Sequence, residues 1–223
     1  MKTIALPVAA FSLLAASSAQ AIVQAYWDMD SSTVSGKLPP SQGTQAGSIS
    51  TSFVEFSAGF IGEIQPGIGG TTENILPPPS ATNRAVGFFR AGSVYFDGAF
   101  EMANFDFTGL TDASLSFAYR SDNVFTWDSN LEIDYRIDDG SWVDFAEGET
   151  YNPDWTIATI DFGSILDGQS NVDFRIRTDS WASIAGYLDI DNVQVNAIPE
   201  PSTYALLLGI SLLGLVAWRR KRS

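Results

Sequence analysis

The 223-residue sequence contains no cysteine and no histidine. Without cysteine no disulfide can form, so an exported domain of this sequence must be held by its hydrophobic core or by a metal ion. Without histidine, the Ser-His and Cys-His nucleophile systems and nearly all zinc sites are excluded. Gly67–Gly70 also lacks the lysine and the helix of a phosphate-binding loop. We therefore expect a protein that is not an enzyme.

Positive charge is scarce between the two ends of the chain. Residues 22–198 contain seven Lys and Arg residues against 25 Asp and Glu residues, a net charge of about −18. A field of this sign repels nucleic acid and anionic membranes and favours cations. We therefore expect no nucleic-acid partner. The many acidic residues leave one enzymatic alternative, a secreted glycan hydrolase that uses two carboxyl groups.

The N-terminal segment has the three parts of a secretory signal peptide. Lys2 precedes an apolar stretch from Ile4 to Ala16, and the small residues Ala19 and Ala21 form an A-x-A cleavage site. The pattern predicts a signal peptide at residues 1–21 that is cleaved after Ala21, which leaves residues 22–198 as one exported domain.

The C-terminal segment, residues 199–223, also has three parts. A rigid polar tripeptide comes first, then an uncharged apolar run of 15 residues from Tyr204 to Trp218, and last a basic cluster. A helix needs roughly 17–25 apolar residues to span a bilayer, so we expect a short transmembrane helix at residues 204–218. Because basic residues stay on the cytoplasmic side as a stop-transfer signal, the domain before the helix is expected outside. The tripeptide and the cluster are Pro199, Glu200, Pro201, Arg219, Arg220, Lys221 and Arg222.

This order of parts resembles the PEP-CTERM sorting signal of Gram-negative bacteria that make extracellular polysaccharide. The resemblance implies a processing partner, an exosortase, which is an integral membrane protein that cuts near the tripeptide. It also implies a location: the protein is anchored in the inner membrane by its C-terminus, and then reaches the cell surface or the extracellular matrix. The alternative is an ordinary tail anchor with a proline-bearing linker.

The exported domain alternates apolar and polar residues with the period of two that is typical of half-buried strands. The clearest stretches are residues 25–30, 115–119, 131–137 and 172–177. No stretch shows a helical period, so we expect an all-β, antiparallel β-sandwich. Residues 31–83 are rich in Ser, Thr, Gly and Pro, and are expected to form a long excursion with one or two strands at residues 53–56 and 60–61.

A second resemblance covers most of residues 25–195. An opening Trp-x-Met strand, a Leu-x-Ile-x-Tyr strand that runs into Asp-Asp-Gly-x-Trp, an Asn-Val-x-Phe-Arg-Ile-Arg strand and a closing Gly-Tyr-Leu-Asp-Ile-Asp-Asn-Val-Gln-Val strand are similar to jelly-roll modules. Such modules include MAM-like, lectin-like and carbohydrate-binding domains of bacterial surfaces. The resemblance implies a jelly-roll-like sandwich and makes extracellular polysaccharide a candidate partner.

The closing strand changes phase at residues 191–192, because Leu188 and Ile190 share one parity and Val193 and Val195 the other. A one-residue slip turns all later side chains to the opposite face unless a bulge absorbs it. The sequence therefore predicts a β-bulge at this point, which is expected to turn a polar group inward.

The same region contains the candidate metal site. In jelly rolls the first and last strands commonly pair, which would bring acidic side chains of the two strands together. Several carboxylate and carbonyl oxygens in one place favour calcium over softer metals. The candidate calcium ligands are Asp28, Asp30, Asp189 and Asp191. The alternative is that these aspartates face solvent.

Four tryptophans divide into two pairs by context. Trp127 and Trp181 lie in stretches rich in Asp and Ser, and are candidates for exposed rings that stack on sugars. Trp142 and Trp155 are expected in the core. The leading hypothesis is a non-enzymatic surface or matrix protein that is exported and sorted. A calcium-dependent carbohydrate-binding module and a secreted glycan hydrolase are the alternatives.

Overall fold

The structure is a computed structural model of the chain. It describes residues 20–29, 38–55, 64–76, 84–91, 98–121, 131–149, 152–178 and 185–200, together with Gly209, Ser211 and Trp218. These last three residues are helical, and the rest of the predicted helix at residues 204–218 lies outside the described part. Among the described residues, no helix is long and apolar enough to cross a membrane.

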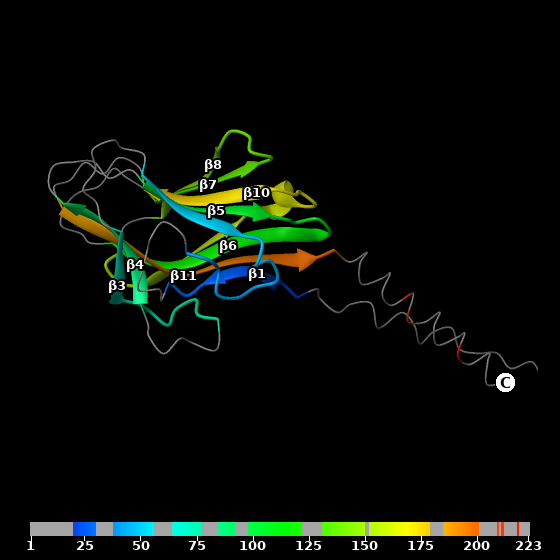
Figure 1. Cartoon of the computed structure of the whole chain (residues 1–223), viewed down its shortest axis with the longest axis horizontal. Helices are drawn as coiled ribbons and strands as arrows, with labels where there is room; N and C mark the ends of the chain where they lie inside the picture. Colours follow the sequence, from blue (N-terminus) through cyan, green and yellow to red (C-terminus); the bar gives the residue numbers. More distant parts are fainter. Residues whose placement is uncertain are drawn as a thin grey trace, which may run out of the picture.

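The described strands form two antiparallel sheets (Figure 1). Sheet A has the order β3-β4-β11-β6-β9, and β1 also pairs with β11. Its strands are β1 (Ile22–Trp27), β3 (Ile64–Gly69), β4 (Arg84–Ala91), β6 (Leu110–Ser121), β9 (Thr156–Asp161) and β11 (Ala185–Pro199). Sheet B has the order β2-β5-β10-β7-β8, made of β2 (Ser50–Glu55), β5 (Gly98–Phe105), β7 (Leu131–Ile137), β8 (Val143–Glu149) and β10 (Val172–Thr178). A short 3-10 helix, η2 (Gly163–Leu166), follows β9.

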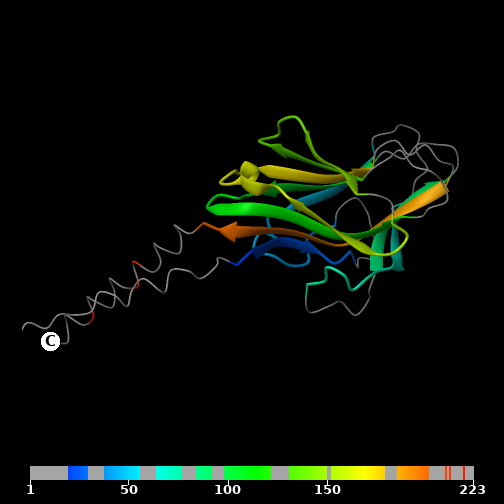
Figure 2. The ribbon, with the colours of Figure 1, turned by 180° about the vertical axis from the view of Figure 1, so that it is seen from behind.

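The two sheets pack face to face around one hydrophobic core (Figures 1 and 2). Alternate residues of several strands supply it, for example Leu115 and Phe117 of β6 and Phe174 of β10. Trp27 of β1 connects the sheets, since its ring lies edge-on to that of Phe100 in β5 with 5.8 Å between ring centres. The strand pairing and this core confirm the predicted all-β, antiparallel sandwich.

The first and last strands pair, as the jelly-roll resemblance implies. The register of this pair runs from Ile22 opposite Ala197 to Trp27 opposite Val193. The start of β1 therefore lies beside the end of β11. The chain enters and leaves the sandwich at the same end of sheet A.

Part of the predicted excursion at residues 31–83 packs on the sandwich. β2 overlaps the strand expected at residues 53–56, whereas β3 was not predicted. The strand expected at residues 60–61 lies outside the described residues. A turn covers the outer edge of β1, where the Tyr26 N–H donates to the Gln42 carbonyl at 2.8 Å. In this turn Gly43 has a φ of +126°, and a Cβ there would lie 2.3 Å from the Gln24 carbonyl oxygen. The turn therefore requires glycine.

Candidate functional site

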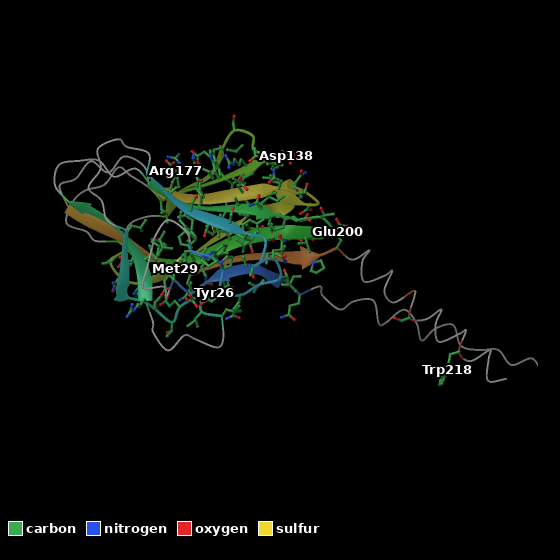
Figure 3. The ribbon with its side chains drawn as sticks, in the orientation of Figure 1. Tyr26, Met29, Asp138, Arg177, Glu200 and Trp218 are labelled. Carbon is green, nitrogen blue, oxygen red and sulfur yellow. The ribbon has the colours of Figure 1, made fainter. Side chains whose placement is uncertain are left out.

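β11 continues beyond the expected end of the exported domain at residue 198. Pro199 lies opposite Leu110 of β6, and the Glu200 N–H donates to the Gly109 carbonyl at 3.0 Å. Figure 3 labels Glu200 at the end of this strand. The first two residues of the predicted sorting tripeptide are therefore held against sheet A.

The predicted β-bulge is present in β11. The register against β6 shifts between Asp191 and Gln194, and Asn192 has a φ of +51°, a left-handed conformation that asparagine tolerates. Val193 and Val195 lie in the core after the slip. The bulge therefore absorbs the change of phase that the sequence shows.

Asn192 is the centre of a buried polar network on the outer face of sheet A. Its Oδ1 accepts a hydrogen bond from the Tyr26 hydroxyl at 2.7 Å, and its Nδ2 donates to the carbonyls of Thr71 and Glu73, each at 2.9 Å. The Asn74 side chain donates to the Asn192 carbonyl at 2.7 Å. These bonds fix residues 71–74 over the bulge.

The three predicted calcium ligands that the structure describes, Asp28, Asp189 and Asp191, all interact with other protein groups. Asp191 accepts two backbone N–H groups, each at 2.8 Å, and Asp189 forms an ion pair with Arg120 at 2.7 Å. Asp28 is half-buried. In the described part of the chain, the carboxylate oxygens of these three aspartates do not lie close enough together to bind one ion.

The carboxylates that the structure does bring together lie on sheet B. Oxygen atoms of Glu132, Asp134 and Asp144 lie within 4.8 Å of one another, close enough to hold one metal ion. Asp134 and Asp144 are directly opposite in β7 and β8, a like-charge pair that is unfavourable without a counter-charge. Arg175 and Arg177 of β10 supply that charge, because both form ion pairs with Asp134 and the second also pairs with Glu132.

Two buried oxygens of this cluster form no hydrogen bond among the described residues, and of these Oε2 of Glu132 is in an ion pair with Arg177. Oδ1 of Asp134 has no hydrogen-bond partner in the described part of the chain, although only 1% of the side chain is exposed. Three carboxylates against two guanidinium groups leave one net negative charge, and oxygen ligands suit a hard cation such as calcium. This cluster was not predicted from the sequence. The sequence does contain a signal for it: β7 has acidic residues at alternate positions, and β10 has arginines at alternate positions.

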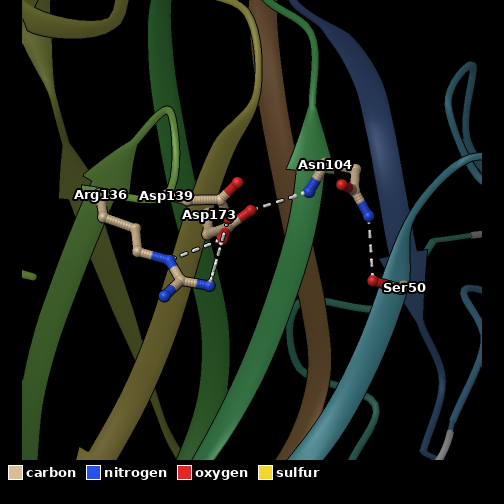
Figure 4. Close-up of polar contacts among 5 residues, drawn as sticks. All are labelled: Ser50, Asn104, Arg136, Asp139 and Asp173. Carbon is tan, nitrogen blue, oxygen red and sulfur yellow. Dashed lines mark hydrogen bonds and ion pairs between the residues drawn. The ribbon is translucent and has the colours of Figure 1, made fainter. Parts of the chain in front are cut away.

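A second row of polar contacts crosses four strands of sheet B (Figure 4). Arg136 of β7 pairs with Asp173 of β10 at 2.7 Å. Asp173 also accepts the N–H of Asn104 in β5 at 2.9 Å, and the Asn104 side chain donates to the Ser50 hydroxyl of β2 at 3.0 Å. The row ties these strands together on the face opposite the core.

The expectation that Trp142 and Trp155 lie in the core is wrong. Both are half-buried and stack on arginines. The guanidinium carbons of Arg136 and Arg175 lie 4.5 and 4.4 Å from the centre of the Trp142 ring, and that of Arg120 lies 4.7 Å from the Trp155 ring. The attraction between a guanidinium and an aromatic face accounts for these positions outside the core.

Several predicted functional residues lie outside the described residues. They are Ala19, Asp30, Trp127, Trp181, Pro201, Arg219, Arg220, Lys221 and Arg222. Ala21 is described and directly precedes β1, so the predicted cleavage would leave the first residue of that strand as the new N-terminus. Signal cleavage and sugar stacking by the two tryptophans stay predictions.

Burial raises the pKa of three carboxylates on the outer sheet faces, those of Glu101, Asp134 and Asp189. It raises the pKa of Asp134 and of Asp189 above the ordinary value of 3.8, although Arg175 and Arg120 respectively oppose the shift. Burial likewise raises the pKa of Glu101 above 4.5. Ionising such a group costs folding free energy, because the charge loses its water.

The fold and the tail together define an all-β sandwich with a sorting segment at its C-terminal end. Residues 197–222 match the family model of the PEP-CTERM protein-sorting motif. The C-terminal segment is therefore a PEP-CTERM sorting motif, which confirms the first resemblance. No curated protein matches the sequence significantly.

Three solved structures that match the fold share little sequence with this chain. TmCBM61 in complex with beta-1,4-galactotriose is 11% identical, with 65% of this chain and 86% of that chain covered and a TM-score of 0.41. The CBM22-1 xylan-binding domain from Paenibacillus barcinonensis Xyn10C is 11% identical, with 78% of this chain and 93% of that chain covered and a TM-score of 0.40. The K1 cleaved adhesin domain of Lys-gingipain from Porphyromonas gingivalis W83 is 14% identical, with 79% of this chain and 97% of that chain covered and a TM-score of 0.41.

Replacing Asn192 should destabilise the sandwich through its buried network. Asn192→Ala removes a hydrogen-bond partner from one hydroxyl and two carbonyls of this network, and a buried polar group that loses its partner costs about 1–3 kcal/mol. We expect a loss of at least about 2 kcal/mol in the free energy of unfolding, measured by denaturant titration. Asn171→Ala is the matched control, because Asn171 also has a positive φ, of +52°, but its side chain makes no hydrogen bond among the described residues. Equal losses in the two variants would contradict the network.

Asp189→Asn should change how stability depends on pH. Because burial raises the pKa of Asp189, the folded state holds its proton more tightly than the unfolded state does. The wild type therefore loses stability relative to the variant as pH rises from 3.8 through the raised pKa. Melting temperatures across this interval should show the difference, wild type minus variant, falling with pH. A difference that rises with pH would contradict the effect of burial.

Proposed function

We propose that this chain is an exported, non-enzymatic surface or extracellular-matrix protein of a polysaccharide-producing Gram-negative bacterium. In this proposal residues 1–21 direct secretion and the sandwich is the exported part. The C-terminal segment holds the chain in the inner membrane through a helix at residues 204–218, until an exosortase processes it near Pro199, Glu200 and Pro201.

The observation that carries the proposal is the sorting motif that continues directly from β11. The arrangement of the strands supports it, because Ile22 lies beside Ala197 at one end of sheet A. A signal peptide before Ile22 and a membrane helix after Ala197 would reach the same membrane from the same end of the sandwich. The two signals are therefore geometrically compatible.

A non-enzymatic role is supported by the composition and by the state of the buried acids. The chain has no histidine or cysteine to act as base or nucleophile. The buried carboxylates with raised pKa values, Asp134 and Asp189, each form an ion pair with arginine. Such pairs hold the outer sheet faces together.

Replacing the tripeptide should block processing without releasing the protein. With Pro199, Glu200 and Pro201 changed to alanine, the apolar run and the basic cluster still anchor the chain, so full-length protein should collect in the membrane fraction. The wild type should lose the segment after the tripeptide. Fractionation followed by mass spectrometry measures both, and replacing Ser202 and Thr203 by alanine is the control. Exported wild type that retains Ser223 would contradict the sorting function.

A calcium-dependent carbohydrate-binding module is the second candidate function. One observation supports the binding of calcium. The oxygen atoms of Glu132, Asp134 and Asp144 are close enough to bind one ion, and one buried oxygen of Asp134 has no hydrogen-bond partner among the described residues. We therefore propose calcium at this cluster rather than at the predicted site of Asp28, Asp30, Asp189 and Asp191. Binding of polysaccharide through Trp127 or Trp181 rests on the sequence alone.

Calcium should raise the melting temperature of the wild type, and a chelator should lower it. At free calcium of about 100 times the Kd, binding contributes about 2.7 kcal/mol, or roughly 5–10 °C for a domain of this size. Asp144→Asn should abolish the shift, because it removes a ligand but no arginine ion pair of the described residues. Asp28→Asn should leave the shift unchanged. A melting curve insensitive to chelator, or loss of the shift only in Asp28→Asn, would refute this site.

A further inference from the structure

The last residues of β11 are paired with the strands beside them. Ala197 pairs with Ile22 of β1, and Ile198 lies opposite Thr111 of β6, whose hydroxyl donates to the Ile198 carbonyl at 3.4 Å. Pro199 follows in the same register. The sorting motif, which begins at residue 197, therefore starts inside the sheet.

Glu200 extends this pairing by one residue onto a fixed turn. Its N–H donates to the Gly109 carbonyl at 3.0 Å, and the side chain is half-buried. The turn is held from two sides, because the Leu110 N–H donates to the Phe107 carbonyl at 2.9 Å and the Gly168 N–H donates to the Leu110 carbonyl at 3.2 Å. The surface against which Glu200 lies is therefore part of the folded sandwich.

A peptidase commonly binds the chain around the cut bond in extended form and pairs with its backbone groups, as in strand addition. Backbone groups that already pair within a sheet are not available for this contact. We propose that sheet A shields the peptide bonds up to Pro199–Glu200, so that the processing enzyme cuts C-terminal to Glu200. The proposal rests on the proposed function, since it names where the processing of that function occurs.

The chemistry of such a cut is simple hydrolysis. One amide C–N bond after Glu200 breaks, water supplies a hydroxyl to the carbonyl carbon, and a proton goes to the departing nitrogen. The exported product then keeps all of β11. A cut before Pro199 would instead remove the residue opposite Leu110 and leave backbone groups of β6 without their partner strand.

Shielding can be tested without the processing enzyme. The purified full chain in detergent is treated briefly with proteinase K, which cuts with little sequence preference, and the C-termini of the fragments that keep the sandwich are read by mass spectrometry. We expect termini at Glu200 or later. Fragments that end at Ala197, Ile198 or Pro199 while the sandwich stays folded would overturn the proposal.

Cutting in the cell is tested by locking the strand end. Ile198→Cys with Thr111→Cys places two thiols on opposite residues, whose Cα atoms in an antiparallel pair lie roughly 4.5–5.5 Å apart, within the reach of a disulfide. The sequence has no other cysteine. The locked variant should be processed to the same terminus and extent as the wild type and the two single variants.

Two results of this experiment would overturn the proposal. One is a wild-type product that ends before Glu200. The other is a locked variant that stays full-length until a reductant restores processing, because the strand end would then have to leave the sheet before cutting. Export of wild type with Ser223 intact is a different result. It contradicts the sorting function itself, while the proteinase K digestion still decides whether sheet A shields these bonds.

Discussion

The β-bulge at residues 191–192 is the constraint on which sheet A depends. β11 pairs with β4 in its first part, with β1 in its last part and with β6 along most of its length. Without the one-residue slip, Val193 and Val195 would face away from the core. Because of the bulge, the residues before it and the residues after it face the same core. β11 can therefore pair with β4 in its first part and with β1 in its last part.

The bulge also explains why the segment at residues 71–74 packs on the sheet. A buried polar group without a partner costs about 1–3 kcal/mol, and the bulge buries the side chains of Asp191 and Asn192. Residues 71–74 satisfy both. The sequence predicted the bulge from local parity alone. It could not predict this docking, since the partners are about 120 positions apart in the chain and nothing local distinguishes the segment from an unstructured loop.

The two sheet faces show what strand alternation can and cannot predict. Alternation at residues 131–137 and 172–177 predicted β7 and β10 and their core residues. The same pattern implied that Glu132 and Asp134 face water, yet both are buried. They are buried because arginines of β10 lie across them, and only the neighbour relation of β7 and β10 reveals this. The position of Trp142 depends on the same relation, since its ring stacks on arginines from both strands.

The sorting motif and the fold share residues, which the boundary predicted at residue 198 from the position of the tripeptide does not show. Backbone N–H groups point alternately to the two edges of a strand, and the Glu200 N–H points to β6. The missing N–H of Pro199 would therefore point toward β1. β1 begins at Ile22, opposite Ala197, so Pro199 lies past its first residue. Proline is tolerated at such an unpaired edge, and the length of β1 thus determines where the first proline of the motif can stand.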